Sequence, residues 1–254
     1  MAESRWTHAR FATTAWTEVL AARGVSGAKS ARALEELCRK YWKPAYAYLR
    51  HKGRSREEAA DLVQDYFAAA LEKGFFDGAE RERGRFRTYV LATLNRFLAS
   101  HRPAARRART LPLEMVPPEE LAESARLARD IQGAASAEEL YCREWARALV
   151  NAALLRLEAE SRGTRRERYV QVFLAQVESA GAGAGADRPG GSGTLATYAE
   201  LGARFGLSES DVTNYLHRGR RLYDQALRRE LRNSVGSDRE AEEELSDLRR
   251  YLGG

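Results

Sequence analysis

The stretch TLATYAELGARFGLSESDVTNYLHRGRRLYDQALRRELR, residues 194–232, decides the fold that the sequence predicts. Its first part carries apolar residues at helical spacing: Leu195, Tyr198, Leu201 and Phe205. Residues 206–208, Gly-Leu-Ser, interrupt this pattern, and a second helix is expected to begin at Glu209 with the serine as its N-cap. Two short helices joined by a tight turn that contains glycine form a helix-turn-helix.

The second helix of this stretch divides into two faces at about 100° per residue. The apolar face collects Val212, Tyr215, Leu216, Gly219, Leu222 and Tyr223. The polar face collects Ser210, Thr213, Asn214, His217, Arg220 and Arg221. Such polar groups can pair with base edges and phosphates. A solvated surface helix would show the same division, but the turn, the cap and the crowded arginines favour a recognition helix.

Composition bounds the fold class and the partners. The chain of 254 residues is 44% hydrophobic and 31% charged, which suits a soluble globular protein of one or two domains. No alternating β-branched run occurs, so the predicted class is all-α. A formal net charge of +6 and a pI near 9.4 suggest an anionic partner.

Cysteine usage and hydropathy bear on location and chemistry. The two cysteines, Cys38 and Cys142, lie far apart within apolar helical patterns, which predicts buried thiols rather than a disulfide or a zinc site. No segment has the length and apolarity of a membrane span, and the N-terminus lacks a signal-peptide core, so we expect a cytoplasmic protein without membrane insertion. No nucleophile-base pair or set of metal ligands emerges, which predicts neither an enzyme nor a cofactor or metal site.

The N-terminal half predicts a helical domain over residues 28–102, after an extension with one short helix at residues 1–27. A helix is expected over residues 28–50, where Pro44 predicts a kink or break. Ser55 caps the next helix, which should end at Gly74. The inner face of that helix collects Val63, Tyr66, Phe67, Ala70 and Leu71, and the opposite face collects Glu57, Glu58, Asp61, Asp65 and Glu72. The acidic face is either solvated or a docking surface for a basic protein.

A further helix is expected within residues 85–102, RFRTYVLATLNRFLASHR, and arginines flank it on both sides. Four precede it or lie in its first turn: Arg81, Arg83, Arg85 and Arg87. Four lie at or beyond its end: Arg102, Arg106, Arg107 and Arg109. Arginines interleaved with aromatic residues such as Phe86 and Tyr89 suit single-stranded nucleic acid, on which bases stack and guanidinium groups follow the backbone. The alternative is a core helix with solvated arginines at its ends.

The C-terminal half predicts a second domain over residues 138–232, joined to the first by a linker at residues 103–137, where Pro112, Pro117 and Pro118 prevent a continuous helix through the first part. Residues 179–193, rich in glycine and alanine, predict a flexible loop within this domain. The tail, residues 233–254, is acidic. It is either a solvated terminal helix or a segment that screens the basic recognition helix until a partner displaces it.

Three motifs, taken in order, resemble a known family. DLVQDYF, residues 61–67, resembles the D-L-x-Q-[ED]-x-F signature of the sigma-70 class. FRTYVLATLNRFLASHR, residues 86–102, resembles the F-R-x-[WFY]-L helix of extracytoplasmic-function (ECF) sigma factors, and LHRGR, residues 216–220, resembles the end of their helix-turn-helix. The likeness covers nearly all of residues 11–232 and is closest to a subset of ECF factors with longer chains.

The resemblance implies two small helical domains, sigma region 2 and sigma region 4, and it assigns residues to three contacts. Contact with RNA polymerase is implied for Asp61, Leu62, Gln64, Asp65 and Phe67, the last as support from the inside. Contact with the unwound −10 element is implied for Arg85, Phe86, Arg87, Tyr89, Asn95, Arg96, Ser100 and Arg102. Contact with the duplex −35 element is implied for Ser208, Ser210, Thr213, Asn214, His217, Arg218, Arg220 and Arg221.

This chain also departs from the family pattern. Arg96 and Ser100 stand where relatives often carry Asn and Asp, and residues 213–215 read Thr-Asn-Tyr where many members carry Lys-Ser-Arg. The promoter sequence is therefore not transferable from the family. The implied function is promoter recognition and melting by core RNA polymerase, with room for an anti-sigma factor or other regulator as a further partner. Two alternatives stay open: a helix-turn-helix regulator that acts without polymerase, and a helical adaptor that binds only proteins.

Overall fold

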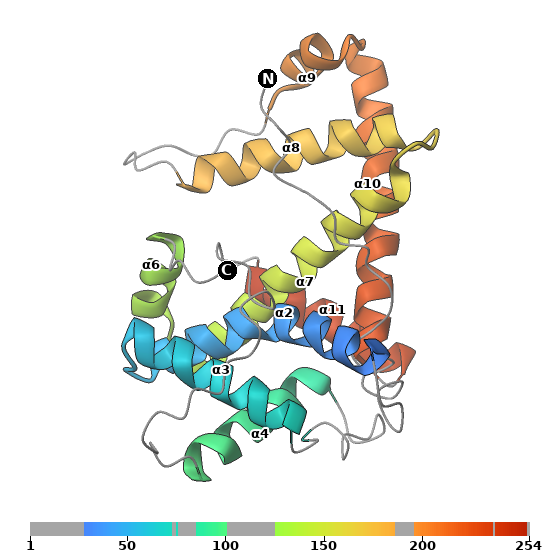
Figure 1. The fold of residues 1–254 in the computed structure, drawn as a ribbon. Coiled ribbons are helices and arrows are strands. Elements are labelled where there is room, and N and C mark those ends of the chain that lie inside the picture. Colours follow the sequence, from blue (N-terminus) through green and yellow to red (C-terminus); the bar gives the residue numbers. More distant parts are fainter. Residues whose placement is uncertain are drawn as a thin grey trace. The chain divides into compact units, whose positions relative to one another are not determined.

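A computed structural model describes residues 28–72, 75, 85–100, 125–185, 196–235 and 237–252 (Figure 1). Every regular element within these residues is an α-helix, which confirms the all-α class for the described part of the chain. The helices are α2 Ala28–His51, α3 Arg56–Glu72, α4 Phe86–Ser100, α6 Ala125–Gly133, α7 Ala137–Ser161, α8 Glu167–Gly185, α9 Tyr198–Phe205, α10 Glu209–Ser234 and α11 Asp238–Leu252. None of these described helices is both long and apolar enough to cross a membrane.

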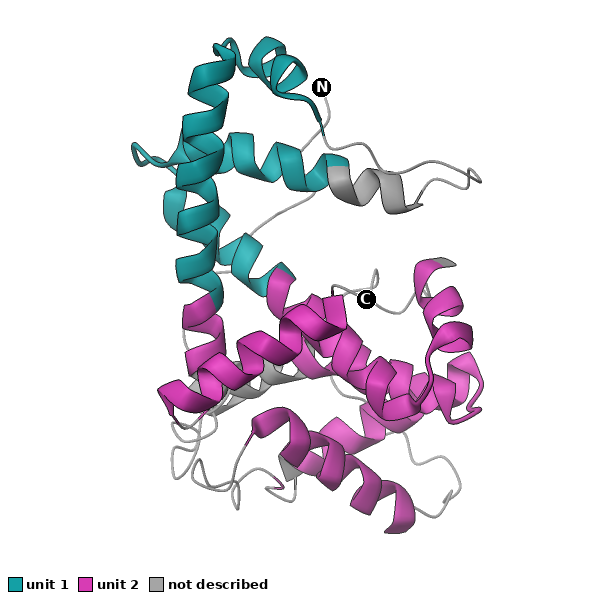
Figure 2. Cartoon of the chain, turned by 180° about the vertical axis from the view of Figure 1, so that it is seen from behind, with its two compact units in different colours: residues 1–12, 151–227 teal, residues 13–150, 228–254 magenta. Residues whose placement is uncertain are grey.

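The described residues form two compact units (Figure 2). Unit 1 contains residues 151–227, and unit 2 contains the described residues up to 150 together with residues 228–252. Helices α7 and α10 each contribute one end to unit 1 and the other to unit 2. The boundary between the units along the chain therefore falls inside two helices. Most of the predicted linker, residues 103–124, lies outside the described residues.

The core of unit 2 is aromatic. Helix α2 continues through Pro44, so the helix does not break there. Tyr41, Trp42 and Tyr48 on this helix are at most 2% exposed. Burial of these rings outweighs the backbone hydrogen bond that proline removes. Helix α3 packs on α2 and begins with a reciprocal cap, in which the Ser55 hydroxyl accepts from the Glu58 amide and the Glu58 carboxylate accepts from the Ser55 amide.

The core of unit 1 depends on a close approach of α8 and α10. Gly219 is buried, and a Cβ atom at this position would lie 2.5 Å from Cβ of Phe173. Tyr215 packs edge-on against Tyr169, with ring centroids 4.7 Å apart, and Phe173 lies 5.5 Å from the ring of Tyr223. Glycine at position 219 lets the two helices come close enough for these ring contacts to form.

Parts of the predicted linker, of the predicted loop and of the acidic tail form helices. Residues 125–133, in the predicted linker, form α6 and bury Leu127 in unit 2. Helix α8 runs to Gly185 and so extends into the predicted loop at residues 179–193. The acidic tail forms α11, whose Leu245 and Leu248 are buried in unit 2. The predicted N-terminal extension, residues 1–27, lies outside the described residues.

Candidate nucleic-acid interfaces

The predicted helix-turn-helix is present as α9, a short turn and α10. Helix α9 begins with a capping box, in which the Thr197 hydroxyl accepts from the Glu200 amide and the Glu200 carboxylate accepts from the Thr197 amide. It ends at Gly206, whose φ of 64° is left-handed and whose N–H donates to the Gly202 carbonyl. Glycine adopts this conformation without the strain that a Cβ atom brings, so the predicted break at residues 206–208 has a backbone cause.

A second glycine shapes the same turn. The amide of Leu207 also donates to the Gly202 carbonyl, at 2.9 Å. A Cβ atom at position 202 would lie 2.7 Å from the carbonyl oxygen of Leu207, closer than real Cβ contacts. The turn can therefore fold back over α9 only because residue 202 has no side chain.

The start of α10 is capped as predicted. The Ser208 hydroxyl accepts from the Asp211 amide at 3.1 Å and donates to the Asp211 carboxylate at 2.6 Å. Ser208 was also among the residues expected to contact the −35 element. In this structure its hydroxyl caps the N-terminus of α10. The Ser208 hydroxyl is therefore engaged in capping, and contact of this residue with DNA stays a prediction.

The predicted division of α10 into two faces agrees with the burial of its residues. Val212 and Leu216 are buried, whereas Ser210, Thr213, Asn214, His217, Arg220 and Arg221 are all exposed. The Thr213 hydroxyl donates back to the carbonyl of Glu209 at 2.9 Å. Asn214 and His217 are thus on an open helix face one turn apart, where an amide and an imidazole could reach the edges of neighbouring bases.

Two arginines of α10 contact α8 while staying exposed. Arg218 donates to the Tyr169 hydroxyl at 2.7 Å, and its guanidinium lies 4.9 Å from the centre of that ring. Arg220 donates to the side-chain oxygen of Gln176 at 3.0 Å. These contacts hold the two guanidinium groups beside the polar face of α10, a position suited to an anion such as phosphate.

The residues implied to bind polymerase lie on α3 in unit 2. Asp61 is exposed, and Leu62, Gln64 and Asp65 are half-buried. Phe67 is fully buried and packs edge-on against Tyr66, with ring centroids 5.0 Å apart. This placement matches the supporting position expected for Phe67. Contact with polymerase itself stays a prediction.

The residues implied to bind the −10 element are divided. Phe86 is fully buried against Tyr41, with ring centroids 5.4 Å apart, and Tyr89 donates its hydroxyl to the Phe75 carbonyl. The expected stack of bases on Phe86 therefore has no open ring face in this structure. The physical reason is that an apolar ring at the first turn of α4 gains more from the aromatic core than from solvent.

Farther along α4, three more of these residues are exposed. Asn95 accepts a hydrogen bond from the Tyr48 hydroxyl at 2.8 Å, and Arg96 is open to solvent. The Ser100 hydroxyl donates to the carbonyls of Arg96 and Phe97. Arg102 lies outside the described residues. This exposed end of α4 is separate along the helix from the arginines at its beginning.

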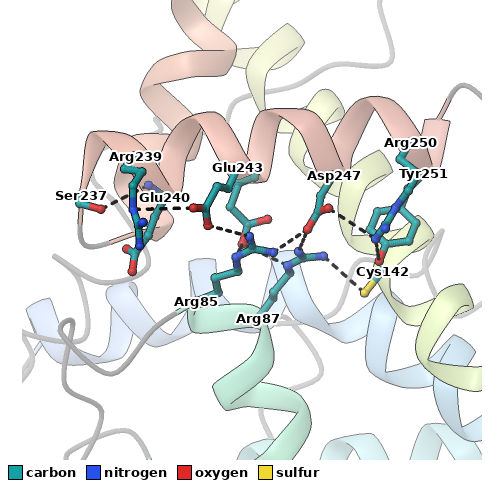
Figure 3. A network of polar contacts seen from close by, with 11 residues as sticks. Arg85, Arg87, Cys142, Ser237, Arg239, Glu240, Glu243, Asp247, Arg250 and Tyr251 are labelled. Carbon is teal, nitrogen blue, oxygen red and sulfur yellow. Dashed lines mark hydrogen bonds and ion pairs between the residues drawn. The ribbon is translucent and has the colours of Figure 1, made fainter.

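The two arginines at the start of α4 face the acidic helix α11 (Figure 3). Arg87 is only 6% exposed, and its Nε donates to Oε1 of Glu244 at 3.1 Å. One carboxylate oxygen of Asp247 accepts from Arg85 and from Arg87, at 2.5 Å each. Arg85 also donates to Glu243 at 3.1 Å. The sequence pattern indicated the acidic tail but not these partners.

The pKa values of the two carboxylates that contact Arg87 are shifted in opposite directions. Burial raises the pKa of Asp247, but the hydrogen bonds and charges of Arg87 and Arg85 more than offset this and hold the pKa below its ordinary value. Burial raises the pKa of Glu244 above its ordinary value despite the attraction of the same arginines. Glu244 also has a buried oxygen, Oε2, with no hydrogen-bond partner among the described residues.

Within the described residues, no group of three or more histidine, cysteine or acidic side chains is placed to hold a metal ion. The candidate interfaces within the described residues are the helix-turn-helix, the acidic face of α3 and the cluster of Arg85 and Arg87 at the start of α4. Comparisons of the chain with protein-family models, with characterised proteins and with solved structures give no match.

Proposed function

We propose that this protein is a sigma factor of the ECF type, which binds core RNA polymerase and directs it to promoter DNA. The observation that carries the proposal is the open polar face of α10, which follows a turn shaped by two glycines. A helix-turn-helix with amide, imidazole and guanidinium groups on its second helix is suited to duplex DNA. The resemblance in motif order and spacing supplies the link to polymerase.

The acidic face of α3 supports the polymerase contact. Asp61 is exposed, while Val63, Tyr66 and Phe67 on the same helix are fully buried. Core packing therefore accounts for the apolar residues of this motif and not for its exposed carboxylate. An exposed carboxylate on a well-packed helix is suited to contact with a basic surface of a partner protein. Opposite charges raise the rate at which the two proteins associate and fix their relative position.

The proposed mechanism needs no reaction on this chain. Unit 1 reads duplex DNA through Asn214 and His217, and arginines beside them neutralise phosphates. Unit 2 docks on polymerase through α3 and binds unpaired bases near α4. These contacts stabilise the melted strand, because bases that no longer stack within the duplex form contacts with the protein instead.

The experiment that tests this function is co-purification of the tagged full chain with core RNA polymerase, followed by transcription from a pool of genomic fragments. Wild type should retain polymerase and yield discrete start sites. The variant Asp61→Arg should lose about tenfold or more in affinity for polymerase, because the basic surface of the partner repels an arginine where it attracts an aspartate.

The matched control is Glu178→Arg, which reverses a charge at an exposed position of α8 in unit 1. This control should retain polymerase as well as wild type does. If neither wild type nor the control binds polymerase while both bind duplex DNA, the sigma proposal is wrong and a regulator that acts without polymerase takes its place.

A further inference from the structure

The guanidinium groups of Arg85 and Arg87 are already occupied by carboxylates of α11 (Figure 3). Asp247 bridges the two arginines with one oxygen, and Glu244 accepts from Arg87. Arg87 also lies over the ring of Trp145, 4.4 Å from its centre. Each guanidinium thus has acidic partners within this protein.

The chemistry of these contacts resembles the binding of phosphate. A guanidinium group recognises carboxylate and phosphate through the same fork of N–H donors. The carboxylates of α11 therefore take positions that backbone phosphates of a nucleic-acid strand would need. Only 6% of the Arg87 surface and 28% of the Arg85 side chain stay exposed, which leaves little room for a second anion.

Helix α11 is held by both apolar and polar contacts. Its Ala241, Leu245 and Leu248 are buried in unit 2, so the docked position is the resting state of this helix. The ion pairs to Arg85 and Arg87 tie the same face of the helix to α4.

The docked helix also has two features that weaken it. The buried Oε2 of Glu244 has no hydrogen-bond partner among the described residues, and such an oxygen loses its water without compensation. An open cleft of about 480 Å³ between α7 and α11 lies beside Cys142 and Tyr251, so the C-terminal end of α11 is incompletely packed. A helix docked in this way can be displaced by a competing polyanion.

We propose that α11 is an intramolecular occupant of the Arg85 and Arg87 site, and that it must leave before unit 2 can bind single-stranded nucleic acid there. This inference rests on the proposed function, which gives the start of α4 a role at the unwound strand. It differs from the sequence-based hypothesis for the tail, which placed the screened surface on α10. The ion pairs of α11 with other segments include those to Arg85, Arg87 and Arg228.

The test compares three full-length proteins for binding of a fluorescein-labelled single-stranded oligodeoxynucleotide at low salt. The variant Glu243→Gln/Asp247→Asn removes two carboxylates that face the arginines. It should bind about tenfold tighter than wild type. The apparent affinity equals the intrinsic affinity multiplied by the fraction of molecules whose site is open, and the variant raises this fraction.

The matched control is Asp238→Asn/Glu242→Gln, which removes the same amount of negative charge from exposed positions of α11. Glu242 pairs with Arg228 at the surface, where such a pair contributes little. This control should stay within about twofold of wild type. Equal gains in both variants would mean a general charge effect, and no gain in either would mean that the site is not covered, so each result overturns the inference.

A second measurement uses wild type alone and does not depend on a variant that folds. Amide hydrogen exchange in α11 should accelerate when the oligodeoxynucleotide saturates the protein, since a displaced helix loses its protection. Unchanged exchange in α11 would overturn the inference. If polymerase is still retained in that case, the proposed function stands without it; if polymerase and DNA of either form fail to bind, the proposed function fails as well.

Discussion

Helix α10 of unit 1 and the start of α4 in unit 2 are both rich in arginine, but their charges differ in availability. On α10, Arg220 and Arg221 are exposed beside an open polar face. At the start of α4, Arg87 is buried and pairs with a carboxylate that lies 157 residues later in the chain. A basic stretch in a sequence therefore indicates a possible anion site, and only the tertiary partners decide whether that site is open.

The largest expected effect concerns a second internally paired arginine cluster of unit 2. Glu144 is 1% exposed and accepts from Arg126 at 2.8 Å and 3.1 Å, and it also pairs with Arg147. The change Glu144→Gln should lower the free energy of unfolding of unit 2 by about 3 kcal/mol, because it removes the buried carboxylate that accepts from both arginines and, among the described residues, leaves only Asp130 to pair with them. Urea unfolding followed by tryptophan fluorescence measures this loss.

The pH dependence of this loss has a definite sign. Burial raises the pKa of Glu144, but Arg126 and Arg147 more than offset this and lower the pKa below its ordinary value. The stabilisation is thus present above the ordinary carboxyl pKa and disappears as the pH falls through the lowered one. The control Glu139→Gln, at a partly exposed pair with Arg143, should cost less than about 1 kcal/mol. Equal losses in the two variants would contradict internal pairing as the basis of stability in unit 2.

The next effect tests the scaffold that keeps the face of α10 open in unit 1. The change Gly219→Ala places a methyl group 2.5 Å from Cβ of Phe173, so α8 and α10 must separate. The expected cost is about 2 kcal/mol, typical of an overpacked core. Hydrogen exchange of α8 and α10 amides measures it. Gly133→Ala, which meets nothing within 4 Å, serves as control and should stay within about 0.5 kcal/mol of wild type.

The smallest effect sharpens the functional side of the comparison. The change Asn214→Ala should weaken binding to a preferred duplex by about 1 kcal/mol, at the low end for a lost base contact, while binding to unrelated duplex changes little. Gln225→Ala alters an exposed residue three turns farther along α10 and should leave both affinities unchanged. Fluorescence anisotropy with the two duplexes measures both quantities. If Asn214→Ala weakens both duplexes alike, Asn214 does not read sequence.

The helix-turn-helix could be predicted in detail because its signals are local. Gly206 ends α9, Ser208 caps α10, and the spacing of Val212 and Leu216 defines the buried face. Each of these features depends on residues within a few positions of one another. The polar face of α10 followed from the same periodicity, since residues between the buried positions must face outward.

The contacts of α11 and α6 could not be predicted in the same way. The acidic run at residues 238–247 predicted a solvated helix equally well, and nothing local in the sequence pairs Asp247 with Arg85 or Leu127 with unit 2. Phe86 was expected to face a nucleic acid because it lies among arginines, yet the Tyr41 ring covers it. Periodicity describes a helix face, but not the distant segment that covers it.

The amino-acid sequence by itself determined the helical class of the described residues, the break at Gly206 and the exposed face of α10, because helix periodicity and backbone sterics act over a few residues. The tertiary structure decided that Arg87 is buried, that α10 approaches α8 at Gly219, and that α11 covers the start of α4. These outcomes depend on charge and volume complementarity between residues far apart along the chain, which only packing can select.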